Sequence, residues 1–131
     1  MRALIVDDEE VVRTITDILL KDVGFDETIQ ATNGREALAF LKNESADLII
    51  SDWSMPKMDG LELVRVCKAD PVLKNIPFVM SSGNGERSEM LQAVEAGVDA
   101  YVVKPFLFNE LQDILEKVGL RADRKSVLVA V

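Results

Sequence analysis

The stretch that decides the fold is LIISDWSMPKMDG, residues 48–60. Its first residues are apolar and mostly branched, as in a strand that is buried on both faces of a parallel sheet. This strand pattern runs directly into the carboxylate of Asp52, and the Met-Pro pair and Gly60 then indicate a turn. Placing a charged group beside a hydrophobic core costs free energy unless the charge is paired or coordinates a metal ion. The rest of the sequence should therefore indicate what the Asp52 carboxylate pairs with or binds.

The same pattern recurs along the whole chain, because short β-branched runs alternate five times with segments of helical periodicity. The expected strands are residues 3–6, 28–31, 48–51, 78–81 and 100–103, and the second is the weakest. Five alternating units with right-handed crossovers predict a doubly wound α/β fold, with its ligand site at the carboxyl ends of the strands. Residues 1–120 are expected to form this one domain.

Five apolar stripes at helical spacing are expected to face the core. They comprise Val11, Val12, Ile15, Ile18 and Leu19; Ala37, Leu38 and Leu41; Leu61, Val64 and Cys67; Met90, Leu91 and Val94; and Leu111, Ile114, Leu115 and Val118. Asn33 and Asn109 are expected as N-caps, and Gly97 and Gly119 occupy positions typical of C-terminal caps.

Composition excludes several classes of function. The chain of 131 residues has no histidine, which removes Ser-His-Asp chemistry and the commonest zinc ligands. Its net charge of -8 argues against direct nucleic-acid binding and favours cationic partners or a bound cation. The single cysteine, Cys67, is expected to be buried and reduced. Because no apolar run is long enough to cross a bilayer and the N-terminus turns acidic early, we expect a cytoplasmic protein without membrane insertion.

Polar side chains stand at four of the five predicted strand ends. They are Asp7 and Asp8, Asp52, Ser81 and Ser82, and Lys104 followed by Pro105. Each has an ordinary explanation by itself, as a helix cap, a turn residue or a solvated lysine. Three carboxylates at one edge, however, repel one another unless a cation lies among them or one carboxyl stays protonated. The cluster as a whole therefore indicates a function.

A divalent cation would explain the cluster. Oxygen ligands in a sparse site favour Mg²⁺, which keeps several waters and binds beside phosphoryl groups, over zinc or calcium. Lys104 adds a positive charge for a phosphoryl oxygen, and the Ser82 hydroxyl can donate to another. This set of residues is suited to phosphoryl transfer, which depends on positioning and charge neutralisation.

Four sequence blocks then carry a family resemblance. LIVDD at 4–8, LIISDWSMPKMDGLEL at 48–63, MSSG at 80–83 and YVVKPF at 101–106 occur in the order and spacing of a response-regulator receiver domain of two-component signalling. The resemblance covers residues 2–120. The residues around Asp52 and Lys104 are most similar to those of the chemotaxis-type single-domain regulators.

The resemblance implies a flavodoxin-like sheet of strand order 2-1-3-4-5, flanked by five helices. It makes Asp52 the phosphoacceptor for a phosphohistidine on a partner histidine kinase or histidine phosphotransfer protein. Asp8 and Asp52 would ligate Mg²⁺ through their side chains, Ser54 through its backbone carbonyl, and Asp7 through water or by orienting the site. The domain would then be a signalling phosphoacceptor that catalyses only its own phosphotransfer and autodephosphorylation.

The resemblance also implies a switch. Lys104 would pair with the phosphoryl group, and Pro105 would follow a cis peptide bond. The Ser82 hydroxyl would move toward the phosphoryl group and make room for Tyr101, so that the fourth helix, fifth strand and fifth helix present a changed face to a downstream protein target. Tyr101 as an ordinary edge-strand aromatic is the alternative. Ser82 also departs from the family, in which threonine is more common.

Other functions and extents stay open at this stage. The chain could be a phosphorylation-independent binding module, although its intact acidic cluster, hydroxyl and lysine argue against that. A small phosphohydrolase would need a substrate pocket for which the length leaves no room. Residues 121–131, RADRKSVLVAV, could be a frayed end, a docking strand, or a linker from the receiver to an output domain of a longer regulator.

Overall fold

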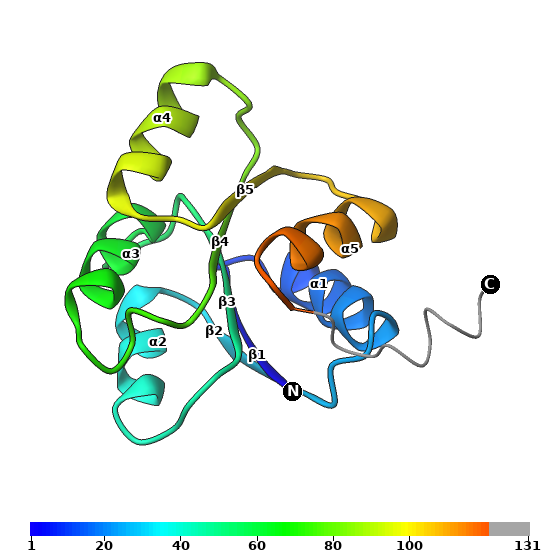
Figure 1. Cartoon of the computed structure of the whole chain (residues 1–131), viewed down its shortest axis with the longest axis horizontal. Coiled ribbons are helices and arrows are strands. Elements are labelled where there is room, and N and C mark those ends of the chain that lie inside the picture. Colours follow the sequence, from blue (N-terminus) through cyan, green and yellow to red (C-terminus); the bar gives the residue numbers. More distant parts are fainter. Residues whose placement is uncertain (121–131) are drawn as a thin grey trace.

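The computed structural model describes residues 1–120, which form a three-layer α/β sandwich (Figure 1). A five-stranded parallel sheet with strand order β2-β1-β3-β4-β5 lies in the middle, which confirms the predicted topology. Helices α1 and α5 cover one face, and α2, α3 and α4 cover the other (Figure 1). The prediction for residues 121–131 lies outside the described residues.

The elements alternate strictly along the chain, and the predicted strand bounds were correct to within one residue at each end. The strands are β1 (Arg2–Val6), β2 (Glu27–Ala31), β3 (Leu48–Asp52), β4 (Phe78–Ser82) and β5 (Ala100–Val103). The helices are α1 (Glu10–Asp22), α2 (Gly34–Leu41), α3 (Gly60–Ala69), α4 (Arg87–Ala96) and α5 (Phe108–Lys117). Within residues 1–120, none of these helices has both the length and the apolar composition needed to span a membrane.

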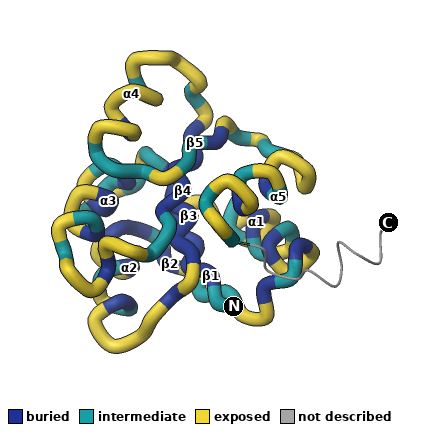
Figure 2. The backbone as a smooth tube through the Cα atoms, viewed as in Figure 1, coloured by how far each residue is buried: buried dark blue, intermediate teal, exposed yellow. Residues whose placement is uncertain are grey.

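Buried residues are concentrated in the central strands of the sheet (Figure 2), and two buried hydrophobic clusters make up the core. Every residue of β3 and β4 is buried, whereas β2 and β5 are edge strands with exposed positions. This difference explains why the second strand gave the weakest sequence pattern, since an edge strand does not need to be apolar on both faces. Parallel pairing brings the carboxyl ends of the strands to one edge of the sheet.

Helix caps were predicted with mixed success. The Asn33 side chain accepts a hydrogen bond from the Glu36 amide at 3.0 Å, and Gly97 adopts a left-handed conformation with φ 111° at the end of α4, as predicted. Asn109 is not an N-cap, because α5 already begins at Phe108 and Leu107 is its capping residue. The Asn109 side chain instead accepts a hydrogen bond from the adjacent Glu110 amide at 3.1 Å.

The predicted core stripe on α1 is wrong in part, and the predicted stripe on α4 is wrong at all three of its residues. On α1, Val11, Ile15 and Ile18 are 70%, 52% and 54% exposed, and on α4 the residues Met90, Leu91 and Val94 are also exposed. A helix that covers one face of a sheet buries only one side, and on α1 this side carries Thr16 and Leu20 instead. The exposed residues therefore form apolar surface on the described part of the protein.

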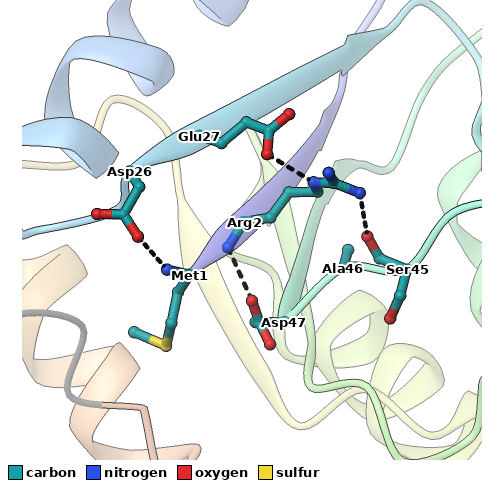
Figure 3. Close-up of a pocket in the computed structure, with 7 residues that line it drawn as sticks. All are labelled: Met1, Arg2, Asp26, Glu27, Ser45, Ala46 and Asp47. Carbon is teal, nitrogen blue, oxygen red and sulfur yellow. Dashed lines mark hydrogen bonds and ion pairs between the residues drawn. The ribbon is translucent and has the colours of Figure 1, made fainter.

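The amino-terminal edge of the sheet contains a pocket of about 350 Å³ that is lined by charged side chains (Figure 3). Arg2 Nε contacts Glu27 Oε1 at 2.9 Å, and the Arg2 amide donates to Asp47 Oδ2 at 2.8 Å. The Met1 amine contacts Asp26 Oδ2 at 2.5 Å. These carboxylates already have partners from the same chain. We therefore interpret the charged lining of this pocket as an ion-pair network that stabilises the fold.

Candidate functional site

The opposite edge of the sheet gathers the residues that the sequence pointed to. Asp7 directly follows β1, and its amide donates to the Ala31 carbonyl at 3.0 Å, which continues the pairing with β2. Asp52 is the last residue of β3 and lies in register with Ser81 of β4. Lys104 follows β5, and its amide donates to the Ser82 carbonyl at 2.7 Å. Parallel pairing therefore brings residues almost 100 positions apart to one edge.

Three carboxylates form the centre of the site. One carboxylate oxygen from each of Asp7, Asp8 and Asp52 lies within 4.8 Å of the other two. Asp7 and Asp52 are buried, whereas Asp8 is exposed to solvent. The cluster thus has two buried carboxylates and one carboxylate that faces solvent.

The Lys104 ammonium group joins two of these carboxylates. Its Nζ lies 3.0 Å from Asp52 Oδ1 and 3.3 Å from Asp7 Oδ2, and its side chain is largely buried. The peptide bond between Lys104 and Pro105 is cis, as the sequence resemblance implied. Lys104 partly neutralises the buried carboxylates, but one ammonium group cannot balance three carboxylates.

The charges at the site shift two pKa values. Burial raises the pKa of Asp52 above the usual 3.8; the contact with Lys104 lowers it again in part, and the neighbouring Asp7 raises it further. For Lys104, burial by itself lowers the pKa, but the nearby Asp52 and Asp7 outweigh burial and raise the pKa above 10.5. Asp52 therefore carries its charge at a cost, which an added cation would reduce.

Two residues that support the site were not found by the sequence reasoning. Arg13 of α1 donates from its guanidinium to the Asp7 carbonyl at 2.8 Å and to Gln30 Oε1 at 3.0 Å, which fixes the chain beside the cluster. A surface arginine on a helix gives no pattern that would predict this contact. Gly60 approaches the Asp52 backbone so closely that a Cβ atom would lie 2.3 Å from the Asp52 carbonyl oxygen.

The sequence did contain a pattern that predicts the start of α3 at Gly60. The Asp59 side chain accepts a hydrogen bond from the Glu62 amide at 2.8 Å, and the Glu62 side chain accepts one from the Asp59 amide at 3.2 Å. An acidic residue followed three positions later by glutamate is the sequence pattern of such a capping box. This box begins α3 immediately after the loop that follows Asp52.

The remaining predicted site residues lie around the cluster, outside the group of paired charges. Ser82 is buried at the end of β4, and its hydroxyl oxygen accepts a hydrogen bond from the Asn84 amide at 3.1 Å. Ser54 is exposed in the loop after β3. The half-buried Tyr101 donates its hydroxyl to the Asn84 carbonyl at 2.7 Å and packs edge-on against Trp53, with ring centroids 6.4 Å apart.

Comparison with known proteins agrees with this geometry. The family model of the response regulator receiver domain matches residues 3–116. The chain is 41% identical over 123 residues to the chemotaxis protein CheY of Pseudomonas aeruginosa, covering 94% of this chain and 99% of that protein.

Solved structures show the same likeness. Chemotaxis response regulator CheY4 of Vibrio cholerae superposes with a TM-score of 0.82 at 32% identity, covering 89% of this chain and 97% of that one. The Mn²⁺-bound form of response regulator Rcp1 gives a TM-score of 0.75 at 27% identity, covering 88% and 91%. The fold, the acidic cluster and these matches together show that the chain belongs to the response regulator receiver domain family.

Proposed function

We propose that this domain accepts a phosphoryl group on Asp52 from a phosphohistidine of a partner histidine kinase or histidine phosphotransfer protein. One observation carries the proposal: the Lys104 ammonium group contacts both Asp52 and Asp7, at 3.0 and 3.3 Å, while Asp8 completes the carboxylate cluster at the solvent side. A lysine that already contacts two carboxylates at the carboxyl ends of the strands can form an ion pair with a phosphoryl group that is added to Asp52.

The transfer follows from ordinary phosphoryl chemistry. A carboxylate oxygen of Asp52 attacks the phosphorus, the bond between phosphorus and the donor imidazole nitrogen breaks, and the imidazole keeps the electron pair. The product is an acyl phosphate on Asp52. Lys104, which already contacts Asp52, pairs with a phosphoryl oxygen and offsets part of the charge that accumulates there.

The donor set fits Mg²⁺. Three carboxylate oxygens within 4.8 Å of one another form an all-oxygen site, and the exposure of Asp8 leaves room for water ligands. Asp8 and Asp52 would bind the ion with their side chains, Ser54 with its backbone carbonyl, and Asp7 through water or by orienting the others. The bound ion would neutralise charge on the phosphoryl oxygens. Rcp1 holds Mn²⁺, another ion that prefers oxygen ligands.

The switch we propose begins at Ser82. Its hydroxyl now accepts from the Asn84 amide, and Asn84 also receives the Tyr101 hydroxyl bond, so the three residues form one chain of hydrogen bonds. Recruitment of the Ser82 hydroxyl to a phosphoryl group would break the first bond and loosen the second. The surface of α4, β5 and α5 would then change toward a downstream protein target, as a shift between two populated states.

The same proposal defines what the domain does outside phosphotransfer. It works in the cytoplasm as a signalling protein, without nucleic-acid binding or membrane insertion, and its only catalysis is its own phosphotransfer and autodephosphorylation. Residues 1–120 form the receiver, and residues 121–131 form a tail or the start of a linker to an output domain.

Covalent labelling tests the proposal. With Mg²⁺ and radiolabelled acetyl phosphate, the wild-type chain should incorporate label that is lost in alkali, as an acyl phosphate is. Asp52→Asn should fold and incorporate none, whereas Asp113→Asn, which removes an exposed carboxylate on α5, should label normally. Labelling that persists in Asp52→Asn would move the acceptor elsewhere. A wild-type chain that never labels would favour the phosphorylation-independent binding module.

A further inference from the structure

Asp8 differs from the other two carboxylates of the cluster in how it is held. Its side chain faces solvent, and none of the ion pairs within residues 1–120 includes it, whereas Lys104 contacts both Asp7 and Asp52. A carboxylate without such a partner takes its place from its own backbone. The position of the Asp8 carboxylate therefore depends on the two peptide groups that flank this residue.

Hydrogen bonds hold both of these peptide groups. The carbonyl of the peptide group between Asp7 and Asp8 accepts from the Arg13 guanidinium at 2.8 Å. The amide of the next peptide group, between Asp8 and Glu9, donates to Asp7 Oδ1 at 2.9 Å. Because a peptide group is planar, fixing one of its polar atoms also orients the Cα atoms at its two ends. The second bond lies within the segment itself, so Arg13 is the residue that ties the Asp7–Asp8 peptide to helix α1.

Gln30 in turn keeps Arg13 in this position. It lies on the edge strand β2, and its side-chain oxygen accepts from Arg13 Nε at 3.0 Å. The next residue of the strand, Ala31, accepts the Asp7 amide at 3.0 Å. A free arginine side chain has many rotamers, and bonds from two of its nitrogens to two different acceptors fix the plane of the guanidinium group. Gln30 carries no charge, so it orients the arginine without neutralising it.

We propose that Arg13 and Gln30 are positioning residues of the acidic site, which set its affinity for Mg²⁺ by holding Asp8 in place. This role rests on the proposed function, in which the acidic cluster binds Mg²⁺. Neither residue belongs to the group of carboxylates that would hold the ion. Mg²⁺ demands near-ideal octahedral geometry, so a rotation of the Asp7–Asp8 peptide that displaces one carboxylate weakens binding. Through Gln30, strand β2, which supplies none of the three carboxylates, contributes to the site.

A purely electrostatic role of Arg13 predicts the opposite sign. A positive charge near a cation site repels the cation, so its removal in Arg13→Met would tighten Mg²⁺ binding if charge alone mattered. Loss of positioning weakens binding instead. Gln30→Leu changes no charge, so electrostatics predicts no effect for this variant. Positioning predicts weaker binding, because the guanidinium group loses one of its two acceptors.

The test measures Mg²⁺ binding to the full-length chain without any phosphoryl donor. Fluorescence of Trp53, the only tryptophan of the chain and the residue after Asp52, is the readout. The dissociation constant for Mg²⁺ should rise about tenfold in Arg13→Met, as is common when a residue that orients a metal ligand is lost. Gln30→Leu should raise it by about threefold through loss of a single hydrogen bond.

Two further variants separate geometry from charge. Arg13→Lys keeps the charge and one donor group, so its dissociation constant should lie between those of wild type and Arg13→Met. Arg65→Met is the matched control, because it removes an exposed arginine from α3, and it should stay within about twofold of wild type. Urea unfolding in EDTA shows whether each variant is folded at the temperature of the binding assay. If Arg13→Met is not, Arg13→Lys and Gln30→Leu provide the same test.

The outcomes distinguish this role from the proposed function. If wild type binds Mg²⁺ and the folded Arg13 and Gln30 variants bind it equally well or more tightly, the positioning role is refuted and the proposed function stands. Weaker binding in Arg13→Met with unchanged binding in Gln30→Leu also overturns the proposal, because Gln30 then has no part in it. A wild-type chain that does not respond to Mg²⁺ would count against the proposed function itself and remove this role with it.

Discussion

Replacing Asp52 with asparagine should make the metal-free protein more stable at neutral pH, although it removes the proposed phosphoacceptor. Asp52 is almost completely buried, at 6% exposure of the residue, and its carboxylate stands beside two other carboxylates. Burial raises its pKa, so the folded state disfavours its charged form. Asparagine has nearly the same shape without the charge, and it removes this penalty.

The magnitude follows from the distances at the site. At an effective dielectric constant of about 20, the Lys104 contact at 3.0 Å attracts by about 5.5 kcal/mol, and repulsion from Asp7 within 4.8 Å is at least about 3.5 kcal/mol. The remaining attraction of at most about 2 kcal/mol opposes a desolvation penalty of several kcal/mol for the buried charge. We therefore expect Asp52→Asn to stabilise the fold by about 1–3 kcal/mol, which corresponds to roughly 3–5 °C in Tm per kcal/mol.

The assay is thermal or urea unfolding in EDTA across a pH series. A carboxyl with a raised pKa contributes stability at low pH that is lost as the pH rises through its folded-state pKa. The advantage of Asp52→Asn should therefore be complete at pH 7 and shrink toward the ordinary carboxyl pKa of 3.8. Asp113→Asn should change stability by no more than about 0.5 kcal/mol. A variant less stable than wild type at pH 7 in EDTA would refute this reasoning.

Three further outcomes are expected. Gly60→Ala should destabilise the fold by about 1–3 kcal/mol in urea unfolding, because its Cβ would press on the Asp52 carbonyl, whereas Gly83→Ala, with open space around its Cβ, should not. Asp8→Asn should abolish both the change in tryptophan fluorescence and the gain in Tm that Mg²⁺ produces in wild type. Tyr101→Phe should cost about 0.5–1.5 kcal/mol by loss of its hydroxyl bond to a loop carbonyl, again measured by urea unfolding.

The exposed stripes show where periodicity stops being informative. Helical spacing correctly predicted that Leu111 and Leu115 are buried on α5, but the same spacing placed Ile15 and Ile18 of α1 in the core. Periodicity reports that one side of a helix is apolar, without stating what covers that side. On α1 the sheet is contacted by the side that bears Leu20. Which side faces the sheet depends on how the helix is rotated against its neighbours.

The support of the site could not be predicted for a related reason. Arg13 reaches the Asp7 carbonyl only because α1 packs beside the end of β1, and no feature of the sequence near Arg13 differs from an ordinary surface helix. The raised pKa values of Asp52 and Lys104 likewise depend on burial and on distances between groups far apart in the chain. These quantities do not exist until the sheet has formed.

The sequence by itself determined the alternation of strands and helices, the strand ends at which Asp7, Asp52 and Lys104 stand, and the kind of chemistry that such residues permit. Local hydrophobic patterning and turn residues encode these properties within a few neighbouring positions. Only the tertiary structure decided that the Lys104 ammonium group contacts two carboxylates, that Asp8 faces solvent, and that α1 exposes an apolar stripe. The physical reason is that ion pairing and burial depend on distances between distant segments, which only packing sets.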